Sequence, residues 1–481
     1  MAASKLFLVL ALSFQLLHVA LCKGSATTGL TSAQQCRLDR IQACQPTRRI
    51  ESEGGVTELW DEEEDQFQCA GVAPIRTVLR PNTISVPQFI SAPHLIFIEQ
   101  GEGILGITFP GCPETFHSGR SAGRSIRGRQ QRWEEGEYGR GETPDLHQKV
   151  HRIRRGDIIA IPEGTVHWCH NDGNEELVAV SVADLNNQAN QLDQRLRAFF
   201  LAGGQGRQSQ QPGQRGERFN IQNIFQPFDD ELLAEAYNIP TEIARNLKRD
   251  DNRGIILNVQ ERMRVMVPDE QQEEEYYEEE GRRRFHPRRG YGSDNGFEET
   301  FCTMRVKHNT ETRREADVYS RQAGRVNIVN MHKLPILQWI DMSAERGNLL
   351  PNALYTLHWS MTDHRIVYVT GGDAHVQIVD QNGRNVFDEQ VSQGSMFVIP
   401  QFFASVTRAG SSGFEWITFK TSSQPMKSPL AGYTSVFRAL PIQVITNAYQ
   451  VSNREAQQLK YNREHQTFLL SPSRRSIRMS A

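Results

Sequence analysis

The sequence predicts a mainly β protein made of two tandem β-barrel modules, each followed by a small helical segment. Three observations carry this prediction. Short apolar runs recur between Gly and Pro residues, this pattern of runs appears twice along the chain, and charged segments of low apolar content separate the runs. Many short strands at even spacing are typical of sandwiches and barrels. A chain of 481 residues is also too long for one hydrophobic core.

The expected strands are apolar runs of four to six residues. In the first half of the chain they cover 95–98, 104–109, 157–161 and 177–182, and in the second half 366–369, 374–379, 396–399 and 414–419. Runs of this length between Gly and Pro favour strands over helices.

The two halves repeat at the level of single residues. His94–Gly101 aligns with His364–Gly371 at an offset of 270, and Gly156–Pro162 aligns with Gly394–Pro400 at an offset of 238. The difference of 32 residues fits a longer loop in the first copy. A barrel duplicated once, rather than a solenoid of short repeats, is therefore expected.

A helical segment is expected after each barrel. Residues 236–248 match residues 448–460 at an offset of 212, and the later copy contains Ser452-x-x-Glu455. That pattern is the capping box of a helix N-terminus.

Three charged or Gly-rich segments are expected to be solvated loops, because they bury too little apolar surface to offset their ordering entropy. They cover 118–147, 203–217 and 268–296. The expected organisation is a leader at 1–22, a first module with its helices at 36–250, a charged linker at 268–296, a second module with its helices at 300–465 and a tail at 466–481.

The N-terminus has the pattern of a secretory signal. Lys5 precedes the apolar run 6–21, and small residues at Ala20 and Cys22 predict cleavage between Cys22 and Lys23. The run is short of the ~20 residues that span a bilayer, so no membrane association is expected. The net charge of −3 offers no basic surface for nucleic acid.

Six cysteines remain after the predicted cleavage, and an even number in an oxidising compartment indicates disulfides. Six cysteines allow 15 pairings, and the spacing alone does not select one.

One motif defines the fold most sharply. From Gly156 the chain reads Gly, five residues, Pro162, one residue, Gly164, two residues, His167, three residues and Asn171. The order matches the second sequence motif of the cupin family, whose barrels hold a metal through histidines. Alternation along the strand should aim His167 into the barrel.

The rest of a cupin metal site is missing from the first module. With Gly101 as anchor, His94 falls at the family's Glu position, and Pro87 and Phe89 fall at its two His positions. A catalytic metal usually has about three protein ligands. We therefore expect His94 and His167 to be buried, hydrogen-bonded side chains and expect no cofactor. A weak metal or small-ligand site in this barrel is the alternative.

The second module departs further from the motif. His364 falls at the Glu position, with Leu357 and Trp359 at the His positions. Ser405 replaces the motif His, and Phe402 replaces its Gly. No ligand cluster is expected in this barrel.

Several stretches resemble the legumin-type (11S) seed storage globulins. They are 51–60, Cys69-Ala-Gly-Val, the run from Phe109 through Cys112, 149–157, Arg325-Val-Asn-Ile-Val-Asn, Arg438-Ala-Leu-Pro and Ser-Asp-Asn295-Gly296-Phe-Glu-Glu-Thr-Phe-Cys302. The resemblance covers nearly all of the chain after the leader. It implies a nutrient reservoir rather than an enzyme; a metal-dependent or small-ligand-binding cupin is the alternative.

The resemblance also implies one cut and two disulfides. An asparaginyl endopeptidase would cut between Asn295 and Gly296, and disulfides Cys36–Cys69 and Cys112–Cys302 would form, leaving Cys44 and Cys169 free. The charges agree with an acidic and a basic chain, since residues from Gly296 onward hold 20 Lys and Arg against 15 Asp and Glu, whereas the remainder holds 34 against 42.

Assembly and location follow from the same resemblance. The family forms trimers that become homo- or hetero-hexamers of like subunits after the cut, in the protein storage vacuoles of seeds. The high Gln and Arg content, with 45 Arg against 9 Lys, suits a nitrogen store.

Overall fold

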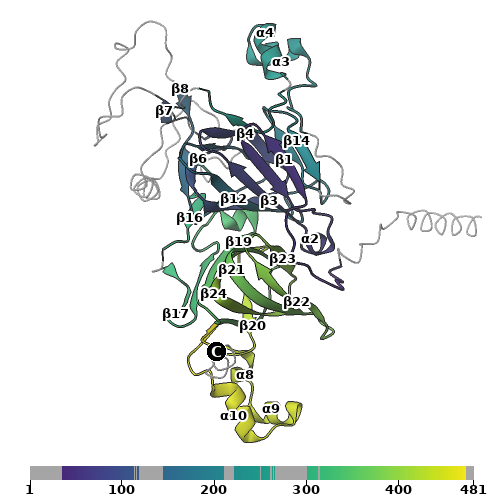
Figure 1. Cartoon of the computed structure of the whole chain (residues 1–481). Coiled ribbons are helices and arrows are strands. Elements are labelled where there is room, and N and C mark those ends of the chain that lie inside the picture. Colours follow the sequence, from purple (N-terminus) through teal and green to yellow (C-terminus); the bar gives the residue numbers. More distant parts are fainter. Residues whose placement is uncertain are drawn as a thin grey trace, which may run out of the picture.

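The computed structural model describes residues 35–112, 114, 116–118, 145–210, 221–249, 251–260, 263, 265, 301–312 and 315–472. The predicted signal cleavage at Cys22 and Lys23 and the predicted processing site at Asn295 and Gly296 lie outside these residues. The described chain forms two stacked barrels with a helical pair at each far end (Figure 1).

The first barrel consists of two facing antiparallel sheets, one of eight strands in the order β14-β1-β2-β3-β12-β5-β10-β16 and one with the order β13-β4-β11-β6-β9, to which β15 is added beside β4. Its strands are β1 Arg48–Ser52, β2 Gly55–Leu59, β3 Val72–Leu79, β4 Thr83–Ile90, β5 His94–Gln100, β6 Glu102–Thr108, β9 Val150–Arg154, β10 Asp157–Ile161, β11 Val166–Asn171, β12 Leu177–Asp184, β13 Ala198–Phe200, β14 Arg207–Gln210, β15 Ile256–Asn258 and β16 Lys307–Asn309. A separate hairpin joins β7 Phe116–Ser118 to β8 Asp145–His147.

The second barrel repeats this arrangement in one ten-stranded sheet. Its strands are β17 Val318–Ser320, β18 Gly324–Val329, β19 Ser343–Leu349, β20 Leu354–Ser360, β21 Arg365–Val379, β22 Asn385–Ser392, β23 Met396–Ile399, β24 Ala404–Lys420, β25 Lys427–Pro429 and β26 Leu469–Leu470. The predicted strands 366–369 and 374–379 are parts of β21, and 414–419 is part of β24. The mainly β fold with two barrel modules is confirmed.

Short helices flank the barrels. They are α2 Asp65–Ala70, α3 Asp230–Tyr237, α4 Thr241–Leu247, α7 Leu337–Ile340, α8 Val436–Ala439, α9 Ile442–Tyr449 and α10 Asn453–Tyr461. The predicted capping box is formed, because the Ser452 hydroxyl accepts from the Glu455 backbone N–H and the Glu455 carboxylate accepts from the Ser452 backbone N–H. No helix in the described part of the chain is long and apolar enough to cross a membrane.

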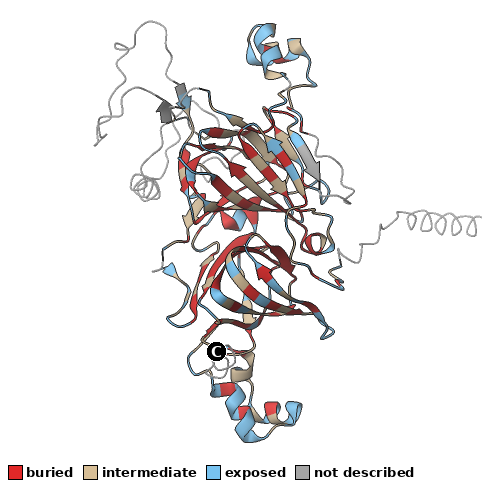
Figure 2. Cartoon of the chain, viewed as in Figure 1, coloured by how far each residue is buried: buried red, intermediate tan, exposed pale blue. Residues whose placement is uncertain are grey.

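One apolar core cluster includes buried residues of both barrels, and buried positions lie on both sides of the contact between them (Figure 2). Strand β10 is buried at all five positions because the second module covers its outer side. The core cluster of the first barrel includes Ile366, Tyr368 and Phe419 from the second. The two barrels therefore pack as one body rather than as beads on a linker.

Candidate functional site

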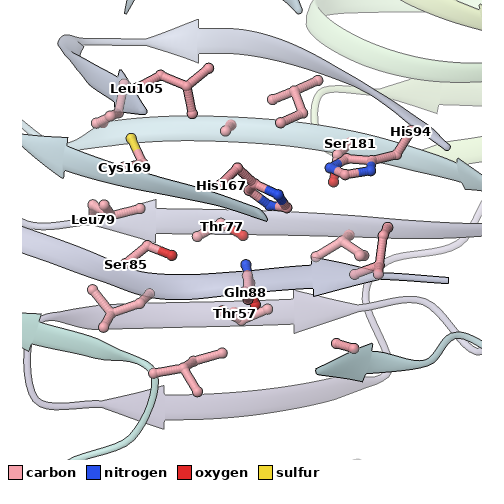
Figure 3. A pocket seen from close by; sticks show the side chains of 18 of the residues that line it. Thr57, Thr77, Leu79, Ser85, Gln88, His94, Leu105, His167, Cys169 and Ser181 are labelled. Atoms are coloured by element: carbon pink, nitrogen blue, oxygen red, sulfur yellow. The ribbon is translucent and has the colours of Figure 1, made fainter. Parts of the chain in front are cut away.

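A cavity of about 120 Å³ lies inside the first barrel, between its two sheets (Figure 3). Most of its lining is apolar, from residues such as Ile75, Leu105 and Ala198. The polar lining residues are Thr57, Thr77, Ser85, Gln88, His94, His167, Cys169 and Ser181. The lining contains no Lys, Arg, Asp or Glu.

His167 projects into this cavity from β11, as the sequence predicts. Its Nδ1 lies 3.2 Å from the carbonyl oxygen of Thr165. A carbonyl only accepts, so Nδ1 holds the proton and Nε2 is left as an acceptor in the neutral ring. Burial lowers the pKa of His167 to about 4, so the ring is neutral at neutral pH.

His94 faces His167 from β5, with 5.1 Å between the ring centroids. Burial, and secondarily the neighbouring His167, hold the pKa of His94 well below its usual range. Its Nδ1 is buried without a hydrogen-bond partner in the described chain. The sequence prediction that both histidines are buried is confirmed. A backbone hydrogen bond to Ala92 raises the pKa of His94 slightly against the effect of burial, so the imidazole is hydrogen-bonded even though its Nδ1 has no partner among the described residues.

A bulge in β4 changes which of its residues face the cavity. On β11, His167 pairs with Gln88 and Cys169 pairs with Ser85, so β4 has one residue more than its partner. Gln88 lines the cavity as a result, whereas Pro87 and Phe89 are absent from the lining, and the Phe89 ring stacks on Phe199. The sequence placement of Pro87 and Phe89 at the ligand positions is therefore shifted by one residue, and Gln88 was missed.

The same bulge recurs in β20 of the second barrel. There Ser405 pairs with His358 and Thr407 pairs with Tyr355. His358 is therefore the counterpart of Gln88, and it is 2% exposed, whereas Leu357 beside it is 45% exposed.

Strand pairing also corrects the counterpart of His94. In the first barrel Ile161 pairs with His94, and in the second Ile399 pairs with Arg365. Gly101 and Gly372, rather than Gly371, share a positive φ, of 81° and 70°. The offset along this strand is thus 271 rather than 270, and Arg365 takes the place of His94.

The interior of the second barrel is filled by a buried charge network. The Glu345 carboxylate lies 3.0 Å from Nζ of Lys420 and 2.6 Å from Nζ of Lys427, and it accepts from the Tyr355 hydroxyl at 2.7 Å. Burial lowers the pKa of Lys427 to about 8. Burial alone would raise the pKa of Glu345, but the two ammonium groups outweigh it and hold that pKa well below its usual range.

The histidine of the second barrel has both ring nitrogens occupied. Nδ1 of His358 lies 2.7 Å from the Thr356 carbonyl oxygen, and Nε2 accepts from the Arg365 guanidinium at 2.5 Å. A guanidinium stays protonated and has no lone pair to give a metal. The donor set of this barrel therefore does not resemble a metal site.

Comparison with known proteins identifies the family. A family model described as Cupin matches residues 41–207 and 309–457. The chain is 52% identical over 468 residues to 11S globulin seed storage protein 2 of Sesamum indicum, with 97% of this chain and 98% of that protein covered. The chain belongs to the 11S seed storage globulins.

Solved 11S globulins share the fold of this globulin. Procruciferin, the 11S globulin from Brassica napus, matches with a TM-score of 0.76 at 38% identity, covering 91% of this chain and 99% of that one. The coconut allergen cocosin matches with the same TM-score and identity and 100% coverage of its chain. The relatives support a storage role for this globulin.

Two disulfides are present, Cys36–Cys69 and Cys112–Cys302, which are the pairings that the family resemblance implies. His364 lies beside the first of them rather than in the barrel interior. Among the described residues, Cys36, Cys69 and His364 form the one group of three ligand-type side chains close enough to share a metal ion, and its sulfurs are bonded to each other.

The remaining cysteines, Cys44 and Cys169, are free thiols. Burial raises the pKa of Cys169 to about 12 and raises that of Cys44 further. Because the thiolate is the reactive form, neither thiol of this globulin is suited to nucleophilic chemistry.

Proposed function

We propose that this globulin is a seed nitrogen store, deposited in protein storage vacuoles and cut once after Asn295 into an acidic chain 23–295 and a basic chain 296–481. The observation that carries the proposal is the donor set of each barrel. The first presents Gln88, His94 and His167, and the second His358, Arg365 and Ser405. A catalytic metal usually has about three His, Cys or carboxylate ligands and an open position, whereas the first set contains two such side chains and the second contains one.

A chain cut at this position would remain interlocked. Strand β16 belongs to the basic chain but pairs with β10 of the first barrel, and the Thr310 N–H donates to the Gly156 carbonyl at 2.9 Å. In return, Leu38 and Ile41 of the acidic chain lie in the core of the second barrel, where the Ile41 N–H donates to the Val386 carbonyl. Each barrel would thus contain a segment of the other chain.

The cut itself can be tested on protein purified from seed. On a denaturing gel we expect one band without reductant, which reductant splits into a larger acidic and a smaller basic chain. The basic chain should begin Gly-Phe-Glu-Glu-Thr. An unsplit band would contradict both the cut and the covalent link through Cys112 and Cys302.

The interlocking predicts a further result under native conditions. A Cys112→Ser/Cys302→Ser variant, cut by an asparaginyl endopeptidase, should elute from size exclusion with both chains in one peak. The uncut chain should elute as a trimer, and the cut protein as a hexamer. Separation of the chains without denaturant would show that the exchanged segments do not hold them together.

The storage role can be separated from enzymatic function by metal analysis of the seed protein. We expect no stoichiometric transition metal and no turnover of oxalate. Near-stoichiometric Mn, Cu or Fe together with turnover would overturn the proposal.

A further inference from the structure

The cavity of the first barrel occupies the place of the charge network in the second. Equivalent pairings place Ile75 where the second barrel has Glu345, Ser85 where it has Tyr355, and Ala198 where it has Lys427; all three first-barrel residues line the cavity. The long side chains fill the second interior, and the shorter ones leave the first open.

We propose that this cavity binds a neutral single-ring aromatic molecule with one hydroxyl group, a phenol, whose hydroxyl donates a hydrogen bond to Nε2 of His167. The proposal goes beyond storage and does not rest on it.

The size of the cavity selects one ring. An apolar protein cavity of about 150 Å³ binds benzene, and this one is about 120 Å³. A second ring would not fit without movement of the strands. The apolar lining, with residues such as Ile96, Ile159 and Leu196, suits the faces and edges of an aromatic ring.

The polar groups of the cavity favour a ligand that carries a hydrogen-bond donor on its ring. Nδ1 of His167 is committed to the Thr165 carbonyl, so Nε2 faces the cavity as an acceptor. His94 adds a second imidazole whose Nδ1 has no partner in the described chain. A buried polar atom without a partner costs free energy, which a ligand hydroxyl can recover.

The absence of charge around the cavity selects a neutral ligand. No Lys or Arg lines it, and both imidazoles are neutral at neutral pH because burial lowers their pKa values. A carboxylate would be desolvated there without a countercharge, which is costly. We therefore expect discrimination against benzoate, an acid of similar size.

Three probes test these features on the full-length trimer at pH 7. Calorimetric titration and the ligand-induced rise in melting temperature should show binding of phenol, weaker binding of benzene by about tenfold, and benzoate weaker than phenol by at least about a hundredfold. A crystal soaked with phenol should show the ring beside His167 in the first barrel. Equal affinity for phenol and benzoate, or ordered water alone in the soaked cavity, would overturn the proposal.

Two variants connect binding to the site. His167→Leu should weaken phenol about tenfold and change benzene by less than about twofold, because only the hydroxyl loses its acceptor. Ala198→Leu should abolish binding of both by filling the cavity. Ser405→Ala, the matched change in the second barrel, should leave both affinities unchanged. Wild-type phenol affinity in Ala198→Leu protein that elutes as a trimer would contradict the assignment.

Discussion

The two barrels share a strand register but have opposite interiors. Where the first has Ile75 and Ala198, the second has Glu345 and Lys427, and where the first has His94, the second has Arg365. One interior is uncharged and mostly apolar, with a cavity, and the other is charged and filled. The same backbone fold therefore accommodates either an uncharged or a charged interior. This indicates that outer packing and the bulged sheets, rather than the chemistry of the interior, specify the fold.

The largest loss of stability is expected when the carboxylate of Glu345, at the centre of the charge network, is removed. Glu345→Gln leaves Lys420 and Lys427 buried without a countercharge, and we expect a loss of about 3–5 kcal/mol of unfolding free energy. Urea unfolding followed by tryptophan fluorescence measures it. Glu389→Gln is the control, because Glu389 pairs with Arg40, whose side chain is 67% exposed, so that change should cost less than about 1 kcal/mol.

A triple variant sharpens this comparison. Glu345→Ile/Lys420→Met/Lys427→Met replaces the three ionised side chains of the network with apolar ones and leaves His358 and Arg365 in place. Replacing a whole buried ion cluster by apolar residues of similar volume is often neutral or stabilising. The triple variant should therefore be more stable than Glu345→Gln, and a larger loss would show that the second barrel depends on its charges.

The next largest effect is a loss of stability at acidic pH that originates in the first barrel. The pKa of His167 is about 4 in the folded protein and about 6.5 when unfolded. The unfolded chain binds more protons between these values, so stability falls as the pH falls from 6.5 to 4, by about 3 kcal/mol from this group. His94, which faces it, acts in the same direction.

Urea midpoints across this pH range measure the effect. His167→Gln should flatten the slope, whereas Ser405→Ala should keep the wild-type slope, because its hydroxyl does not titrate in this range. An unchanged slope in His167→Gln would show that the ring is already protonated or solvated in the folded state.

The sequence predicted the barrels better than their interiors. Strand 396–399 and the motif from Gly156 to Asn171 were placed correctly, because turn residues and apolar runs fix them locally. The bulge between Ser85 and Gln88 could not be predicted from the sequence. One extra residue reverses which side chains of a strand face the interior, and the extra residue is recognised only when the pairing with the partner strand is known.

One further error and one unforeseen feature have a similar cause. Aligning His94 with His364 matched residue types, whereas pairing across the sheet selects Arg365. Lys420 at the end of a strand would ordinarily be exposed, because Lys is rarely buried unless paired. Its side chain is fully buried only because Glu345, distant in sequence, lies opposite.

The smallest effect concerns the turn before the motif histidine. Gly164 has φ of 64° and Phe402, its counterpart, has φ of 67°, so the second barrel places a large residue in the left-handed region. A Cβ at Gly164 would meet nothing within 4 Å, so Gly164→Ala should cost only the backbone strain, about 1 kcal/mol. Phe402→Gly should raise stability by up to about 1 kcal/mol, because the Phe402 side chain is 64% exposed and loses little packing. Urea unfolding of both variants in the uncut trimer measures these values. A loss above about 1 kcal/mol in Phe402→Gly would mean instead that the ring is covered by a neighbouring subunit, which would explain why the second barrel keeps a strained aromatic residue where the first keeps glycine.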